Sequence, residues 1–412
     1  MEISAKTAAP VSIGRLNPVA ASVRNACIPA GLALFLTSNI VFAGPEGGVV
    51  SAGQGDISTP DANTTNINQY TRNLVIDWRT FNIAVDETVQ FLQPSSSATA
   101  LNRIHDAHPS QIFGSLIANG NVFLLNGSGI FFSPTASVNV NSLIASTLNI
   151  SDDDFMAGNL TFQAPPGQEG GMVVNQGVIE AATGGSVTLM GGAVSNEGVI
   201  LAHAGQVNLV AGNQVTIDFD GDGLMQFAIN KEVFSNARNL DAAVKNSGTI
   251  DATGGTVLMA GSAAAEVFTN VVNNAGVVKA GRIENEGGVI RLVATGSGAS
   301  VINTGTLNAD AADSTSDGGT IKITGGNVTQ AGIVTANSTG GTGGQVTLQA
   351  ADTTLVTGNA IISATSITSS PSQGEGGDGG EIGQGGTVHI LGDKVGLLDM
   401  ASIDVSGALG GG

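Results

Sequence analysis

Hydrophobic residues alternate with polar ones over short runs along most of this chain, and glycines separate the runs. From residue 175 onward the alternation becomes a phrase, Asn-x-Gly-x-Ile-x-Ala followed after a spacer by Gly-Gly-x-Val-x-Leu. Copies of this phrase, the later ones looser, begin at Asn175, Asn196, Asn246, Asn274, Asn303 and Gln330. A two-residue period broken by glycine predicts short strands joined by tight turns, and it argues against helices.

The repeats also predict how these strands assemble. The interval is 21 residues from Asn175 to Asn196 and 28 residues from Asn246 to Asn274. A unit this short cannot bury its own apolar face, so neighbouring copies must stack. We therefore predict an all-β fold, an elongated parallel β-helix (β-solenoid) in which each copy forms one coil.

Each coil has an inner and an outer side that the pattern predicts. We expect Ile200 and Ala202 to point inward from one strand, and Val207 and Leu209 from the next. The repeated asparagines are expected to stack into a ladder of side-chain amides. The residue type at the position between Ile and Ala changes from copy to copy, which is typical of a position that faces solvent. The residues at this position are Glu180, Leu201, Asp251, Lys279 and Asn308.

The composition fits this fold, disfavours nucleic acid as a partner and excludes cysteine chemistry. Sixty of the 412 residues are glycine, 11% are charged and 4% are aromatic, as suits narrow coils with many corners. The net charge of -19 disfavours nucleic acid as a partner, because that requires clustered lysine and arginine. The only cysteine is Cys27, so a chain that has lost its first 43 residues can form no disulfide, thiolate metal site or cysteine nucleophile.

The first 43 residues have the pattern of a signal peptide. Three basic residues precede an apolar stretch from Ile28 to Leu36, and the small residue Ala43 stands before Gly44. We predict a signal peptide over residues 1–43 with cleavage between Ala43 and Gly44. The alternative is a cytosolic start with a chance apolar run, which is too short to span a membrane.

A different set of motifs lies between residues 46 and 155. In chain order they include Gly53-Gln54-Gly55, Leu74-Val75-Ile76-Asp77-Trp78, Ala100-Leu101-Asn102-Arg103-Ile104, Val122-Phe123-Leu124-Leu125-Asn126 and Leu143-Ile144-Ala145-Ser146-Thr147. This series resembles the N-terminal secretion domain of two-partner secretion exoproteins, the filamentous haemagglutinin family. The resemblance implies a right-handed β-helix that begins here, and export through an outer-membrane barrel transporter with periplasmic docking domains.

The two patterns together suggest a domain organisation. We expect a signal peptide over 1–43, a secretion domain over 44–165, and a repetitive β-helical shaft over 166–412 with an insertion near 218–243. The chain ends midway through a repeat without a capping segment, so we expect it to be truncated at its C-terminus.

The resemblance also points to residues that the transporter recognises. The family usually has Asn-Pro-Asn-Gly after the Val-Phe-Leu run, and this chain has Asn126, Gly127, Ser128 and Gly129. The first and last positions of a tight turn are kept, so the turn geometry is expected to survive, without the rigidity that proline would give it. Asn102 and Arg103 belong to the same expected recognition set.

One segment resembles the start of a calcium-binding loop. Asp218, Asp220 and Asp222 alternate, and Gly223 stands at the sixth position. The twelfth position should be glutamate, but it is Ile229. A polar turn within the insertion is therefore the favoured interpretation, and we expect no cofactor. Residues 151–155, with three consecutive aspartates, are expected to form a solvated loop.

We expect no enzyme activity. Catalytic β-helices need paired carboxylates, or an acidic site with a basic residue, on adjacent coils of one face. Here the four histidines are scattered, and no carboxylate recurs at one repeat position. The sequence therefore favours an adhesin or haemagglutinin-like exoprotein, secreted or surface-exposed in a Gram-negative bacterium, with an unidentified cell-surface receptor. The alternative is the stalk of a contact-dependent inhibition toxin or haemolysin whose active domain lies beyond residue 412.

Overall fold

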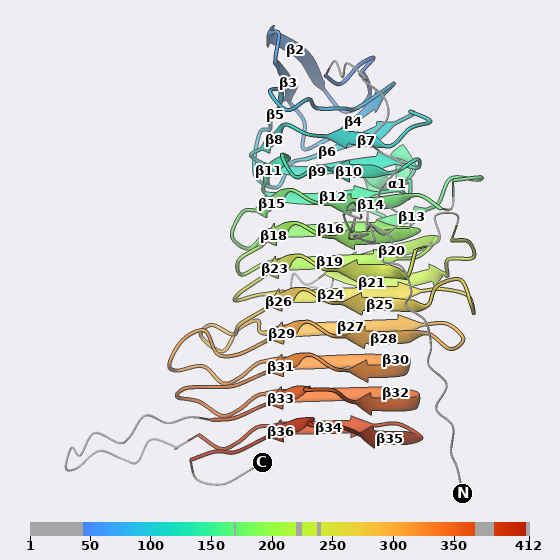
Figure 1. Ribbon diagram of the computed structural model, residues 1–412. Helices are drawn as coiled ribbons and strands as arrows, with labels where there is room; N and C mark the ends of the chain where they lie inside the picture. The colour runs from blue at the N-terminus through green and yellow to red at the C-terminus, as the bar shows by residue number, and fades with distance from the viewer. Residues whose placement is uncertain (1–43, 169, 220–224, 237–239, 367–382, 409–412) are drawn as a thin grey trace, which may run out of the picture. The chain divides into compact units, whose positions relative to one another are not determined.

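The computed structural model describes residues 44–168, 170–219, 225–236, 240–366 and 383–408. The expected signal peptide therefore lies outside the described residues. Figure 1 shows that the described chain winds through successive coils, each resting on the one before. The only helix in the described part is α1 (Asp152–Ala157), and none of its helical segments is long and apolar enough to cross a membrane.

Most strands belong to two long sheets. The larger sheet contains β1 (Val49–Ala52), β4 (Asn73–Trp78), β6 (Thr99–Ile104), β7 (Ser110–Ile112), β9 (Asn121–Asn126), β10 (Ile130–Phe132), β12 (Ser142–Ser146), β14 (Met172–Asn175), β16 (Ser186–Gly191), β17 (Ala193–Asn196), β19 (Gln206–Ala211), β22 (Ala242–Asn246), β24 (Thr256–Ser262), β25 (Asn270–Asn274), β27 (Val289–Thr295), β28 (Ser300–Asn303), β30 (Thr320–Gln330), β32 (Gln345–Val356), β34 (Thr387–Leu391) and β35 (Lys394–Leu397). The smaller sheet contains β2 (Gly55–Asp61), β3 (Thr64–Gln69), β5 (Thr88–Leu92), β8 (Ser115–Ala118), β11 (Ser137–Val140), β15 (Val178–Ala181), β18 (Val199–Leu201), β23 (Thr249–Asp251), β26 (Val277–Lys279), β29 (Thr306–Asn308), β31 (Ile333–Thr335), β33 (Ile361–Ser363) and β36 (Ser402–Asp404).

Most coils contribute three strands, and each strand pairs in parallel with its counterpart in the next coil; β30 and β32 are long strands that each fill two of these positions. For example, β14, β15 and β16 pair with β17, β18 and β19, which pair in turn with β22, β23 and β24. This is the parallel β-helix that the repeats predict. The pairing continues without a break across residue 165, because β10 pairs with β14 and β12 pairs with β16.

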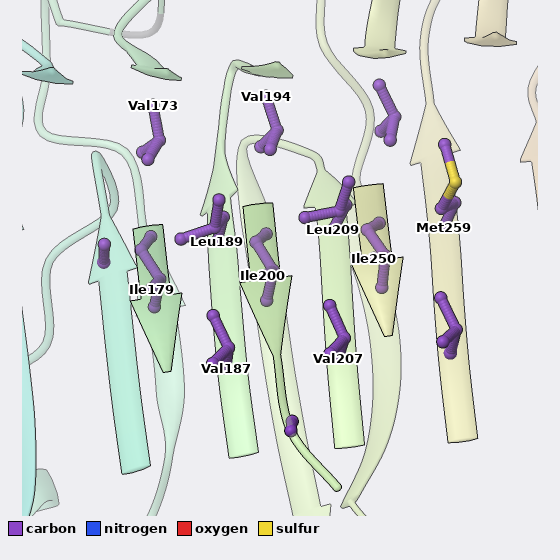
Figure 2. Packing of buried hydrophobic residues seen from close by; sticks show 14 of the residues in the cluster. Val173, Ile179, Val187, Leu189, Val194, Ile200, Val207, Leu209, Ile250 and Met259 are labelled. Carbon is purple, nitrogen blue, oxygen red and sulfur yellow. The ribbon is translucent and has the colours of Figure 1, made fainter. Parts of the chain in front are cut away.

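The core fills the inside of the coils. Ile200, Ala202, Val207 and Leu209 are completely buried, which confirms their predicted inward direction. Figure 2 shows Ile200, Val207 and Leu209 in line with their counterparts in neighbouring coils. Ile200 faces Ile179 on one side and Ile250 on the other, so the same apolar residue recurs at the same place in successive coils.

The second glycine of each glycine pair in the repeat has a steric cause. A side chain at Gly205 would meet the carbonyl oxygen of Gly185 at 1.9 Å, and one at Gly255 would meet that of Gly205 at the same distance. The backbones of successive coils touch at this corner, so only glycine fits there. The second glycine of the Gly-Gly part is therefore a requirement of close stacking, whereas the first has a left-handed backbone, with a φ of +79° at Gly184 and +81° at Gly254.

The repeated asparagines form the expected ladder along the inside of one corner. All members are completely buried. Each donates its side-chain N–H to the side-chain oxygen of the next, over distances of 2.7–2.9 Å, through Asn175, Asn196, Asn246, Asn274, Asn303 and Gln330. Because buried polar groups are costly unless they are hydrogen-bonded, the ladder holds the coils in register.

The N-terminal end of the coil stack departs from parallel pairing. Strand β1 runs antiparallel to β4, and β2 runs antiparallel to β3. Trp78 and Phe81 pack edge to face beneath them, with ring centroids 5.4 Å apart. These antiparallel strands cover the apolar end of the first coil.

A small antiparallel sheet lies outside the coils. Strand β20 (Gln214–Phe219) pairs with β13 (Thr161–Gln163) on one edge and with β21 (Met225–Lys231) on the other. The sheet covers a second apolar cluster, which we call the outer cluster. Its buried members are Val75, Leu101, Phe123, Leu125, Ile144, Leu148, Ile150, Phe155, Leu160, Phe162, Ala164, Met190, Val210, Val215 and Ile217. The insertion therefore packs through Phe227, which touches this cluster, whereas Phe234 is 64% exposed.

The expectation of a solvated loop over residues 151–155 is wrong. Ser151 caps helix α1, and its hydroxyl accepts the Asp154 N–H at 3.1 Å. Carboxylates in the first turn are favoured by the helix dipole. Phe155 points into the outer cluster and packs edge to face against Phe123, with ring centroids 5.7 Å apart. This burial fixes the segment as a helix.

Candidate functional site

The turn from Asn126 to Gly129 connects β9 to β10 and is held by its first residue. The Asn126 side chain is 1% exposed. Its Nδ2 donates to the His108 carbonyl at 3.1 Å and to Ser110 Oγ at 2.9 Å, and its Oδ1 accepts the Ser128 N–H at 2.9 Å. Its backbone carbonyl accepts the Gly129 N–H at 3.0 Å. The turn geometry is therefore intact without the proline of the family pattern.

The outer residues of this turn are Gly127 and Ser128, which are partly exposed. The Ser128 hydroxyl donates to the Asp106 carbonyl at 2.8 Å. Gly129 has a φ of +126°, a conformation that glycine adopts without strain. A side chain at Gly127 would lie 1.9 Å from Gln168 Oε1, so the loop at Gln168 borders the turn.

Asn102 is placed inside the coils. It is completely buried, accepts the Trp78 indole N–H at 2.9 Å, and donates to the carbonyls of Ala100 and Phe123. Its side chain thus supports the first coils from within and is not presented on the surface.

Arg103 connects β6 to the segment that leads into α1. Its side chain is 13% exposed and forms ion pairs with Asp77 at 3.2 Å and Asp152 at 2.6 Å. It also donates to Asn149 Oδ1 at 3.0 Å and to the Ile150 carbonyl at 2.8 Å. The guanidinium is thus occupied by four internal partners.

The pKa of the Asp77 carboxyl group is shifted from its usual value. Burial by itself raises its pKa, but hydrogen bonds from His105 and Arg103, together with the positive charge of Arg103, outweigh burial and lower the pKa below its usual value. The carboxylate is therefore held ionised as the anchor of Arg103.

A polar groove runs from the Asn126 turn towards α1. Two adjoining depressions share Arg103, Asn149 and Pro165 as lining residues. One of them reaches Gly127 and Gln168, and the other reaches Ser151 and Asp152. The sequence motifs do not point to Asn149, Pro165 or Gln168, because none of the quoted motifs includes these residues and they reach the turn only through the fold.

The candidate calcium loop is only partly described. Asp218 is exposed at the end of β20, while Asp220 and Asp222 lie outside the described residues. In the ranges that are described, no three or more His, Cys, Asp or Glu side chains gather as metal ligands would. Of the expected cleavage residues, Ala43 lies outside the described chain and Gly44 is its first residue.

The stacked coils with a covered N-terminal end define a parallel β-helix protein, and comparison with known proteins shows its family. A family model of the TPS (two-partner secretion) secretion domain matches residues 43–309, which is well over half of the chain. The chain belongs to this family. Membership implies a secreted protein of a Gram-negative bacterium and export through a dedicated transporter partner.

The match extends beyond residue 165, where the motifs place the end of the secretion domain. Since the coils also continue there, a boundary at 165 remains a prediction about function and does not mark a break in the fold.

Individual relatives agree with the family. Heme/hemopexin-binding protein of Haemophilus influenzae (strain ATCC 51907 / DSM 11121 / KW20 / Rd) is 34% identical over 173 residues, which is 36% of this chain and 19% of that protein. A second heme/hemopexin-binding protein from Haemophilus influenzae is 37% identical over 94 residues, 23% of this chain and 10% of the relative. The chain thus matches a fifth or less of the length of these relatives.

A solved structure supports the fold along nearly the whole chain. The HMW1 secretion domain from Haemophilus influenzae has a TM-score of 0.68 to this chain at 26% identity, and the match covers 88% of this chain and 98% of that structure. The β-helix is therefore shared with a secretion domain of the same family.

Proposed function

We propose that this chain is the export domain and adhesive β-helix of a secreted or surface-exposed exoprotein of the adhesin or haemagglutinin-like type. The observation that carries the proposal is the outer face of the smaller sheet. Its varied positions Glu180, Leu201, Asp251, Lys279 and Asn308 are in register from β15 to β29 and are all at least partly exposed.

This face suits adhesion because of its regular spacing. Strands in neighbouring coils lie ~4.8 Å apart, so the face offers a row of different side chains at a fixed pitch. Many weak contacts along one rigid row add up through effective concentration. The receptor for such a row is a repetitive cell-surface partner, since a single small ligand would meet only one or two of its positions.

We further propose that the transporter reads the shape of the Asn126 turn and the adjoining polar groove. Asn126 is buried, so its role is to hold the backbone of Gly127 and Ser128 in place. Asn102 and Arg103 act in the same way at a greater distance, because their side chains bond within the protein. All three are positioning residues in this proposal, and the exposed backbone of the turn is the contact surface.

Substitution of Asn126 tests the export part of this proposal. In cells that also produce the transporter, Asn126→Ala should reduce the secreted fraction several-fold, because the turn loses three side-chain hydrogen bonds. Asn139→Ala, at an exposed position of β11, is the matched control and should be secreted normally. Secretion of Asn126→Ala at the wild-type level, measured as the ratio of extracellular to cell-associated protein, would refute recognition of the turn.

The adhesive part needs a separate test. Replacing Glu180, Leu201 and Lys279 together by serine should lower attachment of protein-coated beads to host or bacterial cells. Replacing Arg291 and Lys322, which are exposed and in register on the larger sheet, should leave attachment unchanged. Equal attachment of all three proteins would contradict the assignment of the smaller sheet as the adhesive face.

A second candidate function is binding of heme or hemopexin. It is favoured by the 34% identity to a protein of that name, although the shared segment is only 19% of that protein. Titration of the purified chain with heme, followed by its absorbance spectrum, and with hemopexin, followed by calorimetry, separates this candidate from adhesion.

A further inference from the structure

Gly44 lies against the turn that precedes β5. A methyl group built on its Cα would be 3.7 and 3.8 Å from the two carboxylate oxygens of Glu87, and 3.5 Å from Thr65 Oγ1. The Cα of Gly44, which also carries its backbone nitrogen, therefore lies beside this carboxylate. Glu87 is itself fixed, because its N–H donates to the Ala84 carbonyl at 3.0 Å and its Oε2 accepts the Ala84 N–H at 2.7 Å.

The surroundings of Gly44 are acidic. Glu46, Asp61 and Glu87 line the notch that contains Gly44, and its described lining residues include no lysine or arginine. The nearby Arg79 is paired with Glu46. Asp86, next to Glu87, is not among the lining residues of the notch and accepts a hydrogen bond from Asn63 at 3.2 Å. A positive charge placed in this notch would therefore be stabilised by carboxylates on several sides.

We propose that this notch binds the α-ammonium group of Gly44 after the signal peptide is removed. The inference rests on the proposed cleavage between Ala43 and Gly44. Hydrolysis adds the oxygen of water to the Ala43 carbonyl carbon and leaves an amine on Gly44, which then takes up a proton. Before cleavage the same nitrogen is a neutral amide, so the ion pair with Glu87 exists only in the processed chain.

The pair joins the first residue of the processed chain to the turn before β5. It thereby anchors the segment that leads into β1 and the antiparallel cover of the first coil. Signal-peptide removal thus completes the N-terminal cap in addition to freeing the chain.

The ion pair predicts a defined pH dependence. A free α-amino group titrates at about 7.7–8.0, and pairing with Glu87 raises that pKa in the folded chain. The stabilisation is therefore fully present below the unfolded value and is lost as the pH rises through the higher folded value.

The test uses the exported, processed chain and two variants. The pKa of the α-amine is read from the pH dependence of its acetylation rate by mass spectrometry. The wild-type value should be at least half a unit above that of Glu87→Gln, whose side-chain oxygen can still accept the Ala84 N–H. Asp86→Asn removes the same charge one residue away and should behave like the wild type.

The outcomes separate the inference from the proposed cleavage. The same mass spectra identify the first residue of the exported chain. If it is not Gly44, the cleavage prediction is wrong, and the notch is tested on a chain whose Gly44 amine is generated with a site-specific protease. A Gly44 amine with the same pKa in the wild type and in Glu87→Gln would overturn the inference, as would an equal decrease in both variants.

Discussion

The asparagine ladder allows a quantitative test of how the coils are held in register. Asn246 accepts the Asn196 side-chain N–H at 2.8 Å and donates to Asn274 Oδ1 at 2.7 Å. Asn246→Ala removes both contacts and leaves one donor and one acceptor buried without these partners. Each such group costs about 1–3 kcal/mol, so the free energy of unfolding should fall by about 2–6 kcal/mol.

The end of the ladder provides an internal comparison. Gln330 accepts the Asn303 side-chain N–H at 2.9 Å and is the last member of the ladder. Gln330 also donates its side-chain N–H to the Gly332 carbonyl at 2.9 Å, so Gln330→Ala removes two buried hydrogen bonds and should cost about as much as Asn246→Ala. Asn139→Ala, on the exposed side of β11, should cost no more than about 0.5 kcal/mol.

Urea unfolding followed by circular dichroism measures all three variants. The midpoints of Gln330→Ala and Asn246→Ala should both lie clearly below that of Asn139→Ala. If Asn246→Ala unfolds at the same urea concentration as Asn139→Ala, the ladder does not stabilise the stack and the reasoning is refuted.

Three further predictions follow from burial and charge. Ile200→Asp places an unpaired charge in the core and should abolish the cooperative thermal transition, whereas Leu201→Asp, one residue on and facing outward, should shift it by only a few degrees; equal damage would show that the inner and outer sides are misassigned. Phe162→Ala should destabilise the outer cluster by about 3–5 kcal/mol, seen as faster hydrogen exchange in β20, and unchanged exchange would contradict the packing. The lowered pKa of Asp77 contributes stability above its unfolded value near 3.9 that is lost as the pH falls through the lower folded value; urea midpoints between pH 5 and pH 2 should therefore fall less steeply in Asp77→Asn, and parallel curves would refute the ion-pair role.

The sequence predicts the coils well because their contacts are periodic. Ile200, for example, meets Ile179 and Ile250, which occupy the same place in the repeat. One phrase therefore contains both the strand pattern and its partners. The asparagine ladder is predictable for the same reason.

The parts that the sequence does not predict depend on contacts between unlike segments. Residues 151–155 read as a polar loop because nothing nearby shows that Phe155 will meet Phe123. Strand β13 pairs with β20, about 50 residues further on, and no repeated motif relates the two. An outer cluster that is assembled from such pairs produces no repeating pattern in the sequence.

The candidate recognition residues illustrate the same limit. The motif correctly places Asn126 at the start of a tight turn, because side-chain amides that cap turns are a local feature. It cannot show that Asn102 is buried or that Arg103 is occupied by Asp77 and Asp152. Those facts depend on the neighbouring coil and on α1.

The parallel pairing of each coil with only its immediate neighbours has a consequence for assembly. The strands of each new coil can hydrogen-bond to the strands of the preceding coil. No strand of the two long sheets needs a partner from a distant C-terminal part of the chain in order to pair. A chain that emerges from a pore with its N-terminus first can therefore use each finished coil as the template for the next. Folding would then proceed along the chain as fast as the chain is released. The folded coils would oppose movement of the chain back through the pore.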